Sequence, residues 1–257
     1  MRFGAHHEWG TLREVIIGVP ALAERVAREG VTVHRPESAQ PLVRDALIVL
    51  GDHAIEGSLR QQDRRQERFS VRSFVQKAAL ERGARWSSVP MGRLNAVDGP
   101  FLEGGDTLLN GREIYVGMSG CATDMAGIDW LQALLGERYR VIAVALKSDV
   151  LHLDCAMALI KPGLLVWCPE KLIDGLPMSL RGWDAIAVSK AEATLLATNG
   201  LILEEGRMIL DSDNARVIAE LRKRRMDVIP IPFDGPIRIG GSLRCAHHPL
   251  LRESVLE

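Results

Sequence analysis

Four segments of the chain repeat one pattern, in which two short apolar runs flank a pair of turn residues. The turn pairs are Gly51-Asp52, Asn110-Gly111, Pro162-Gly163 and Glu205-Gly206. Residues of these types suit tight connections between antiparallel strands. The pattern therefore predicts four β-hairpins, over residues 46–57, 106–117, 157–168 and 200–211.

A helical pattern and then a further apolar run follow most of these hairpins. After the second hairpin, Thr123 is placed to cap a helix, and the stretch YRVIAVAL reads as a strand. After the fourth, Ser212 or Asp213 is placed to cap a helix that precedes the strand DVIPIPF. The repeating unit is strand, strand, helix, strand.

Two other stretches complete the pattern. Residues 58–83 are rich in arginine and poor in apolar positions, which predicts one long helix with a solvated basic face. The segment LREVIIGVP near the start adds a fifth apolar strand.

Units of about 50 residues favour a radial architecture, an α/β propeller without a domain boundary. A doubly wound sheet is the alternative, although no glycine-rich phosphate loop follows a predicted strand.

Composition and charge narrow the function. The chain has 257 residues, 47% of them hydrophobic and 25% charged, and a net charge of -1. These values are typical of a globular protein that binds small molecules, and they argue against nucleic acid and anionic membranes as partners. The absence of a secretory or membrane-spanning run predicts a cytoplasmic protein. Four cysteines without a C-x-x-C pair predict reduced thiols.

Three short segments combine glycine, acidic groups and a reactive side chain: FLEGGD from Phe101, HLD from His152 and GGSLRC from Gly240. Each alone reads equally well as a polar turn or a buried structural residue. Together they supply a nucleophile, a general acid/base and an orienting carboxylate, the set that covalent catalysis requires.

Zinc is the rival use of the cysteine at the end of the third segment. Cys245, His247 and His248 have no second Cys/His pair at the usual spacing, and adjacent histidines on an extended segment point to opposite sides. A serine hydrolase is also disfavoured, because no G-x-S-x-G elbow occurs. We therefore expect neither a metal nor another cofactor.

The ordered motifs FLEGGD, HLD and GG-x-x-R-C resemble the signature of the guanidino-group-modifying enzymes, which are the amidinotransferases, arginine deiminases and dimethylarginine dimethylaminohydrolases. EWGTLREVIIG, LVRDALIVLGDHAIEG and GIDWLQALLGERYRV extend the resemblance over nearly the whole chain. It implies a five-bladed α/β propeller of ββαβ modules, with residues 1–257 forming a single catalytic domain.

The resemblance also implies the role of each site residue. Cys245 is the nucleophile that attacks a guanidinium carbon, His152 the acid/base, and Glu103 the carboxylate that positions His152. Asp45 and Asp154 match the carboxylates that grip the guanidinium. Two carboxylates can hold a planar cation in line for attack. We expect Arg244 and the bound cation to lower the pKa of Cys245.

The second attacker decides the reaction. An amine gives an amidinotransferase, and water gives a hydrolase of the arginine deiminase or dimethylarginine dimethylaminohydrolase type. LVRDALIVLGD and GIDWL resemble amidinotransferases, whereas FLEGGD and RCAHHPLLRE resemble hydrolases. Amidino transfer is favoured on chain-wide likeness, and an inactive protein that binds arginine-like ligands is a third possibility. The chain is shorter than amidinotransferases, which predicts a more open site.

Residues for the far end of the substrate are less defined. Lys171, in CPEKL, falls near the place where amidinotransferases have a basic residue for the substrate carboxylate, and Arg181 is a second candidate. Thr198 and Asn199 are candidates for lining the pocket. The expected partners are a guanidino compound and an amine acceptor. A second copy of the chain, in a homodimer, is a further expected partner.

Overall fold

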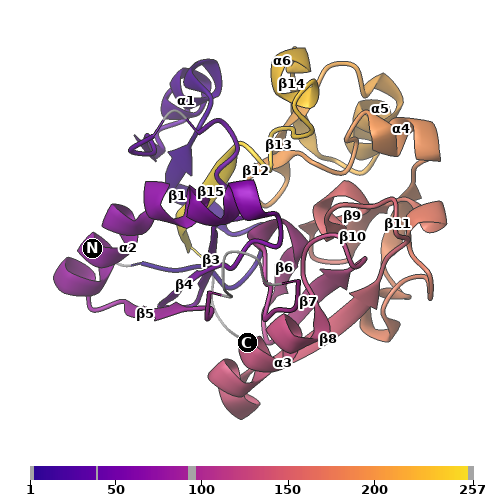
Figure 1. Ribbon diagram of the computed structural model, residues 1–257. Helices are drawn as coiled ribbons and strands as arrows, with labels where there is room; N and C mark the ends of the chain where they lie inside the picture. The colour runs from indigo at the N-terminus through magenta and orange to yellow at the C-terminus, as the bar shows by residue number, and fades with distance from the viewer. Residues whose placement is uncertain (1–2, 39, 92–96, 254–257) are drawn as a thin grey trace.

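Fifteen strands form five three-stranded sheets in the part of the chain that the computed structural model describes, residues 3–38, 40–91 and 97–253. The sheets follow one another around the molecule, with helices on the outside (Figure 1). This arrangement confirms the α/β propeller of ββαβ modules, and it excludes the doubly wound alternative, in which the strands would share one sheet.

Four of the sheets are built from one continuous module each. The first two strands pair antiparallel, and the third lies parallel to the second. In chain order the strands are β3 (Leu47–Leu50), β4 (His53–Glu56) and β5 (Arg85–Ser88); β6 (Thr107–Asn110), β7 (Glu113–Met118) and β8 (Arg140–Ala145); β9 (Met157–Lys161), β10 (Leu164–Trp167) and β11 (Asp184–Ala187); and β12 (Leu201–Glu204), β13 (Arg207–Asp211) and β14 (Asp227–Ile231).

All four predicted hairpins are confirmed. The strands meet at the expected turns, and Leu50 pairs with His53 just as Asn110 pairs with Glu113. Each turn has a glycine in the left-handed region, such as Gly111 at φ 62° and Gly163 at φ 77°. Only glycine adopts these angles without a steric cost, so the turn residues fix both the place and the register of each hairpin.

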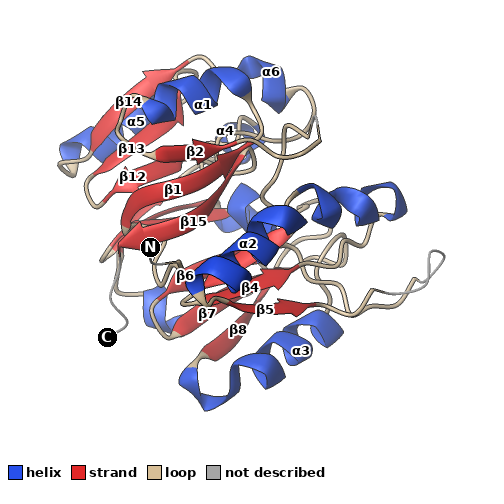
Figure 2. Ribbon diagram, turned by 90° about the vertical axis from the view of Figure 1, so that its left-hand side faces the viewer, coloured by secondary structure: helices blue, strands red, loops and turns tan. Residues whose placement is uncertain are grey.

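The fifth sheet joins the two ends of the described chain. Strand β1 (Thr11–Ile17) lies in the middle, between β2 (Thr32–His34) and β15 (His247–Glu253). β15 runs antiparallel to β1, and the two strands lie side by side in both views (Figures 1 and 2). The apolar strand near the start of the chain is thus confirmed. The strand that follows Cys245 was not predicted.

The helices are α1 (Pro20–Ala27), α2 (Arg72–Arg82), α3 (Met125–Leu135), α4 (Lys190–Thr194), α5 (Ala215–Lys223) and α6 (Asp234–Ile237). The longer ones pack by an apolar face. In α5, Val217, Ile218 and Leu221 are buried at helical spacing. Burial of each such side chain stabilises the fold by about 1.5–3 kcal/mol. No helix in the described ranges combines the length and apolarity needed to cross a bilayer.

Both predicted helix caps are wrong by one or two residues. Asp124, not Thr123, caps α3, and its carboxylate accepts a hydrogen bond from the Gly127 amide. The Thr123 hydroxyl is used elsewhere, as the acceptor for the Glu103 amide at 3.1 Å. Helix α5 begins after Asn214 without a side-chain cap, rather than at Ser212 or Asp213.

The long helix predicted over 58–83 is divided. The 3₁₀ helix η1 (Gln62–Ser70) precedes α2, and its basic face is not solvated. Arg65 and Arg68 are buried, where they donate to the carbonyls of Leu59 and Val89. These hydrogen bonds satisfy guanidinium donors that would otherwise be costly to bury. The prediction failed because it treated the arginine-rich segment as surface.

Candidate active site

The site side chains come from equivalent places in the five modules. Each lies in the segment that leads into the first strand of a sheet, where the modules converge. Asp45 precedes β3, Glu103 precedes β6, His152 and Asp154 precede β9, Asn199 precedes β12 and Cys245 precedes β15. A radial fold brings such segments together although the residues are far apart in sequence.

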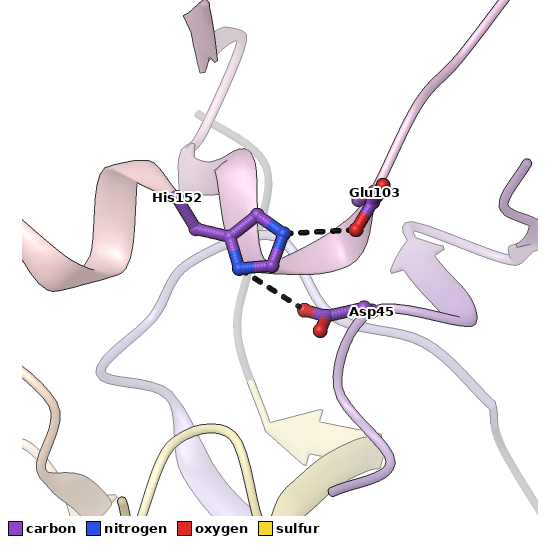
Figure 3. Close-up of side chains that lie close together, drawn as sticks. All are labelled: Asp45, Glu103 and His152. Carbon is purple, nitrogen blue, oxygen red and sulfur yellow. Dashed lines mark hydrogen bonds and ion pairs between the residues drawn. The ribbon is translucent and has the colours of Figure 1, made fainter. Parts of the chain in front are cut away.

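His152 lies between two carboxylates (Figure 3). Its Nε2 donates to Glu103 Oε2 at 2.9 Å, and its Nδ1 lies 3.7 Å from Asp45 Oδ1. The other oxygen of Glu103 accepts the Arg60 amide at 2.9 Å. The structure thus brings together the three residues that the FLEGGD, HLD and LVRD segments predicted for the site.

Carboxylates and a histidine could also hold a metal ion. Asp45, Glu103 and His152 offer ligand atoms within 4.8 Å of one another. Yet the two carboxylates face different ring nitrogens (Figure 3), whose lone pairs diverge in the plane of the ring. One ion could not take both carboxylates and a ring nitrogen without moving them. The arrangement fits a hydrogen-bonded chain better than a chelate.

The carboxylates keep His152 protonated. Burial would lower its pKa, but the charge of Asp45 and the hydrogen bond to Glu103 outweigh burial, and the pKa lies well above the ordinary value. The charge of Asp106 acts in the same direction. His152 is therefore a cation at neutral pH, ready to give a proton to a departing group.

The two glycines of FLEGGD are required by space. A Cβ on Gly104 would lie 2.2 Å from the Arg44 carbonyl oxygen. A Cβ on Gly105 would lie 2.5 Å from Asp45 Oδ1 and 2.8 Å from His152 Cγ. Glycine at these positions therefore allows Asp45 and His152 to approach each other across the motif.

Asp106, the last residue of that motif, holds backbone both in its own module and at the start of the next one. Its Oδ1 accepts the Leu153 amide at 2.9 Å, and its Oδ2 accepts the Thr123 amide at 3.2 Å. Burial raises the pKa of Asp106 to about 7. The sequence reading did not select Asp106, although its place in the motif was visible.

Asp45 is bound to an arginine of the chain itself. Arg64, on η1, donates from Nη2 to Asp45 Oδ2 at 2.8 Å, and its Nη1 lies 3.8 Å from Glu103 Oε2. Glu67 holds the same guanidinium through Nε at 2.7 Å. The opposite oxygen of Asp45, which faces His152, is buried without a hydrogen-bond partner. Arg64 was missed because its segment was expected to be solvated.

Asp154 is likewise bound to an arginine. Arg244 donates from Nη1 to Asp154 Oδ2 at 2.9 Å and from Nη2 to Glu8 Oε1 at 3.1 Å. Burial would lower the pKa of Arg244, but the charges of Glu8 and Asp154 raise it. Glu8, which the sequence reading also missed, thus fixes the arginine next to Cys245.

The Cys245 thiol lies 4.0 Å from Asp154 Oδ2 and is buried. Burial raises its pKa, and the charges of Asp154 and Asp45 raise it further. The expected lowering by Arg244 is therefore wrong for the free protein, because Arg244 is already neutralised by Asp154 and Glu8. The bound cation remains as the group that could lower this pKa.

Thr198 and Asn199 hold backbone around the candidate nucleophile. Asn199 Oδ1 accepts the amides of Arg244 at 2.9 Å and Cys245 at 3.2 Å, and Thr198 Oγ1 donates to the Asp154 carbonyl at 2.7 Å. On the other side, the Cys245 carbonyl accepts the amides of Val43 and Arg44. Rather than only lining a pocket, Thr198 and Asn199 fix the segments that carry Asp154 and Cys245.

The two candidates for the far end of the substrate differ. Lys171 is half-buried, and its Nζ donates to the carbonyls of Cys155 at 2.9 Å and Ala193 at 3.4 Å. This places Lys171 next to the HLD segment. Arg181 is exposed and donates to the Leu176 carbonyl. Lys171 is therefore the better placed of the two.

The histidines after Cys245 belong to β15 rather than to a metal site. His247 and His248 are buried, and burial with the charge of Arg44 holds both pKa values well below the ordinary range. His247 Nδ1 contacts the Leu243 carbonyl at 2.7 Å. Cys245, His152 and Asp154 are all at most 4% exposed.

A family model described as N,N dimethylarginine dimethylhydrolase, eukaryotic, matches residues 32–252 of the chain. The match extends from the first module through Cys245 and into β15. An L-arginine:L-lysine amidinotransferase of Pseudomonas savastanoi pv. phaseolicola is 27% identical over 89% of this chain and 76% of its own length. An uncharacterized protein of Bacillus subtilis is 28% identical over 83% of this chain and 70% of its own length.

Solved structures of both reaction types share the fold. An amidinotransferase of the saxitoxin pathway of Microseira wollei superposes with a TM-score of 0.88 at 22% identity, covering 99% of this chain and 98% of the other. DDAH from Pseudomonas aeruginosa superposes with a TM-score of 0.75 at 18% identity, covering 93% and 100%. The chain therefore belongs to the N,N dimethylarginine dimethylhydrolase family, within the superfamily of guanidino-group-modifying enzymes.

Proposed function

We propose that residues 1–257 form one catalytic domain that moves the amidino group of arginine, or of a related guanidino compound, to an amine through a covalent intermediate on Cys245. One observation carries the proposal: the buried Asp45 oxygen that accepts no hydrogen bond faces His152, while Asp154 lies beside the Cys245 thiol. A guanidinium bound by both carboxylates would present its carbon to the sulfur. Charge-assisted pairs of this kind both bind and orient a planar cation.

The reaction begins when the substrate cation reaches the two carboxylates. Because Asp45 and Asp154 raise the pKa of Cys245 in the free protein, a cation that neutralises them favours loss of the thiol proton to solvent and formation of the thiolate. The thiolate then forms a C–S bond to the guanidinium carbon. As the C–N bond to the departing amine breaks, His152 gives that amine its proton.

The second half frees Cys245, which takes up a proton from solvent again once the product cation has left. His152, now neutral, takes a proton from the incoming amine as this amine bonds to the amidino carbon. The C–S bond breaks, and its electron pair returns to Cys245 as thiolate. Glu103 holds the ring of His152 through both steps, and Lys171 is our candidate for contact with the substrate carboxylate.

The matching relatives support transfer as the first choice. The L-arginine:L-lysine amidinotransferase shares 27% identity over 89% of this chain, and its name supplies both a donor and an acceptor class. We infer an amino acid or another primary amine as the acceptor here.

Hydrolysis through a different thiouronium on the same cysteine, Cys245, is the second candidate. The matching family model describes a dimethylarginine hydrolase, and the motif carboxylate is a glutamate, as in the hydrolases that the sequence resembles. In this case ammonia or a methylamine departs in the first half with the proton of His152, and the ornithine part of the substrate stays on the carbon that is bound to Cys245. Water then attacks this carbon, the C–S bond breaks, and citrulline is released.

A product assay separates the two functions. The protein is incubated with arginine and a panel of amines, and separately with methylated arginine, and the products are identified by mass spectrometry. Ornithine together with a new guanidino compound means transfer. Citrulline with ammonia or a methylamine means hydrolysis. Ligand-induced thermal stabilisation without any product would contradict both and favour the inactive binding protein.

The space at Gly105 gives a prediction for the proposed reaction. Gly105→Ala would place a methyl group 2.5 Å from Asp45 Oδ1 and 2.8 Å from His152 Cγ. Displacing these groups by about 1 Å should lower kcat/KM about 100-fold. Gly182→Ala is the matched control, since nothing lies within 4 Å of a Cβ there, and it should keep the wild-type rate. Equal rates for both variants would show that the close approach is unimportant.

A further inference from the structure

A small cavity lies behind the backbone of the candidate active site. Its volume is about 20 Å³, and Glu8, Arg44, Gly104, Thr107, His248 and Arg252 are among the residues that line it. A water molecule needs about 10–15 Å³ measured in this way, so the cavity has room for one small species. Two lining residues, Arg44 and Gly104, are sequence neighbours of Asp45 and Glu103.

The charged groups around this cavity are unequal in number. Its lining carries two guanidinium groups, those of Arg44 and Arg252, and one carboxylate, that of Glu8. This carboxylate is already engaged, because it accepts from Arg244 at 3.1 Å and from the Leu109 amide at 3.2 Å. Arg252 donates only to carbonyl groups, of Gly10 at 2.7 Å and Ile202 at 2.9 Å. The lining therefore carries more positive than negative charge.

Arg44 has the poorest partners of these buried groups. It is 6% exposed, yet its Nε donates only a long bond to the Gly104 carbonyl, at 3.4 Å, and its Nη2 lies 3.5 Å from Glu8 Oε1. A buried guanidinium is costly unless its donors are satisfied. Burial with the charge of Arg244 lowers the pKa of Arg44 to about 10, and burial lowers that of Arg252 to about 9.

One ring nitrogen of a histidine on the wall also lacks a partner. His248 is 2% exposed, and its Nδ1 makes no hydrogen bond. His248 lines the cavity together with Arg44. Buried polar atoms nearly always have partners in native proteins, so an unfilled cavity with this lining would be exceptional.

We propose that this cavity binds one monatomic anion, chloride under ordinary conditions, held between Arg44 and Arg252. The volume excludes phosphate, sulfate and carboxylates. The single negative charge offsets the excess of guanidinium groups, and N–H donors are the groups that an anion accepts from. Because the Arg44 amide also donates to the Cys245 carbonyl at 3.1 Å, the anion would stabilise the segments that carry Asp45 and Cys245.

The test measures thermal unfolding and locates the ion. Replacing sodium gluconate by sodium chloride at constant ionic strength should raise the Tm of the wild-type protein by about 2–4 °C at 0.2 M. Arg44→Met, which removes the charge and keeps an apolar chain, should lose this rise. Arg13→Met is the control, because Arg13 is an exposed partner of Glu253, and it should keep the rise.

Bromide soaked into crystals of the wild-type protein gives an independent readout that does not depend on the folding of any variant. An anomalous peak between Arg44 and Arg252 is the expected result. The proposal is overturned by water density alone at this position, by equal Tm values in chloride and gluconate, or by a chloride effect that Arg44→Met retains.

Discussion

Replacing Cys245 by serine should lower kcat/KM by at least about 10⁴-fold, because the proposed reaction passes through a bond to this sulfur. A serine hydroxyl is a far weaker nucleophile, and His152 is protonated in the free protein, so no neighbouring base is free to activate it. The rate is measured as product formed from arginine. Intact-protein mass spectrometry should find the amidino adduct on wild-type protein and none on Cys245→Ser.

Cys121→Ser supplies the matched control. Cys121 is half-exposed, and its Sγ contacts the Ser148 carbonyl at 3.2 Å, away from the carboxylates of the site. This variant should keep the wild-type rate and the adduct. A Cys245→Ser protein that works within tenfold of wild type would contradict covalent catalysis at this position.

Replacing His152 by asparagine should have the second largest effect, a loss of about 10²–10⁴-fold in kcat/KM. Asparagine keeps a donor near Glu103 but cannot give a proton to the departing amine or take one from the next attacker. The loss should be smaller for a substrate with a good leaving group, which needs no proton. If both substrates lose activity equally, His152 acts by holding the structure rather than by transferring a proton.

The pH dependence follows from the carboxylates around His152. Activity requires protonated His152, so kcat/KM should fall as the pH rises through the raised pKa of this group. Glu103→Gln keeps the size of the side chain but removes a charge that raises this pKa, and it should move the fall to lower pH by about one unit. Asp45 and Asp106 also face His152 and remain in this variant. The measurement is kcat/KM of both proteins from about pH 6 to 10. If kcat/KM falls at the same pH in Glu103→Gln as in the wild type, the fall belongs to the titration of another group.

The local parts of the fold could be predicted because single residues determine them. Turn glycines such as Gly111 and Gly163 fix the hairpins, and the helix of the fourth module follows from its apolar spacing. Strand β15 was missed because its pairing with β1 joins residues about 240 positions apart, and the segment was read only for its chemistry. The break between η1 and α2 depends on distant carbonyls that accept from buried arginines.

In the candidate site too, local motifs could be recognised, whereas contacts between distant segments could not. Motifs identified Asp45, Glu103, His152 and Cys245, because each side chain lies in a recognisable segment. The cations that hold the carboxylates were not predicted to do so: Arg64, which binds Asp45, lies in a segment expected to be solvated, and Arg244, which binds Asp154, was expected to lower the pKa of Cys245. Such pairs depend on how modules meet, which no local pattern records. The pKa of Cys245 was misjudged for this reason.

The position of Cys245 two residues before β15 has a consequence for biosynthesis. Synthesis runs from β1 toward β15, so the sheet that contains β1 waits for its outer strand until residues 247–253 have been made. A nascent chain that ends before His247 can form the other four sheets, but β15, the strand that anchors the thiol, is still missing. Reactivity at Cys245 should therefore appear only after β15 has been synthesised and has paired with β1.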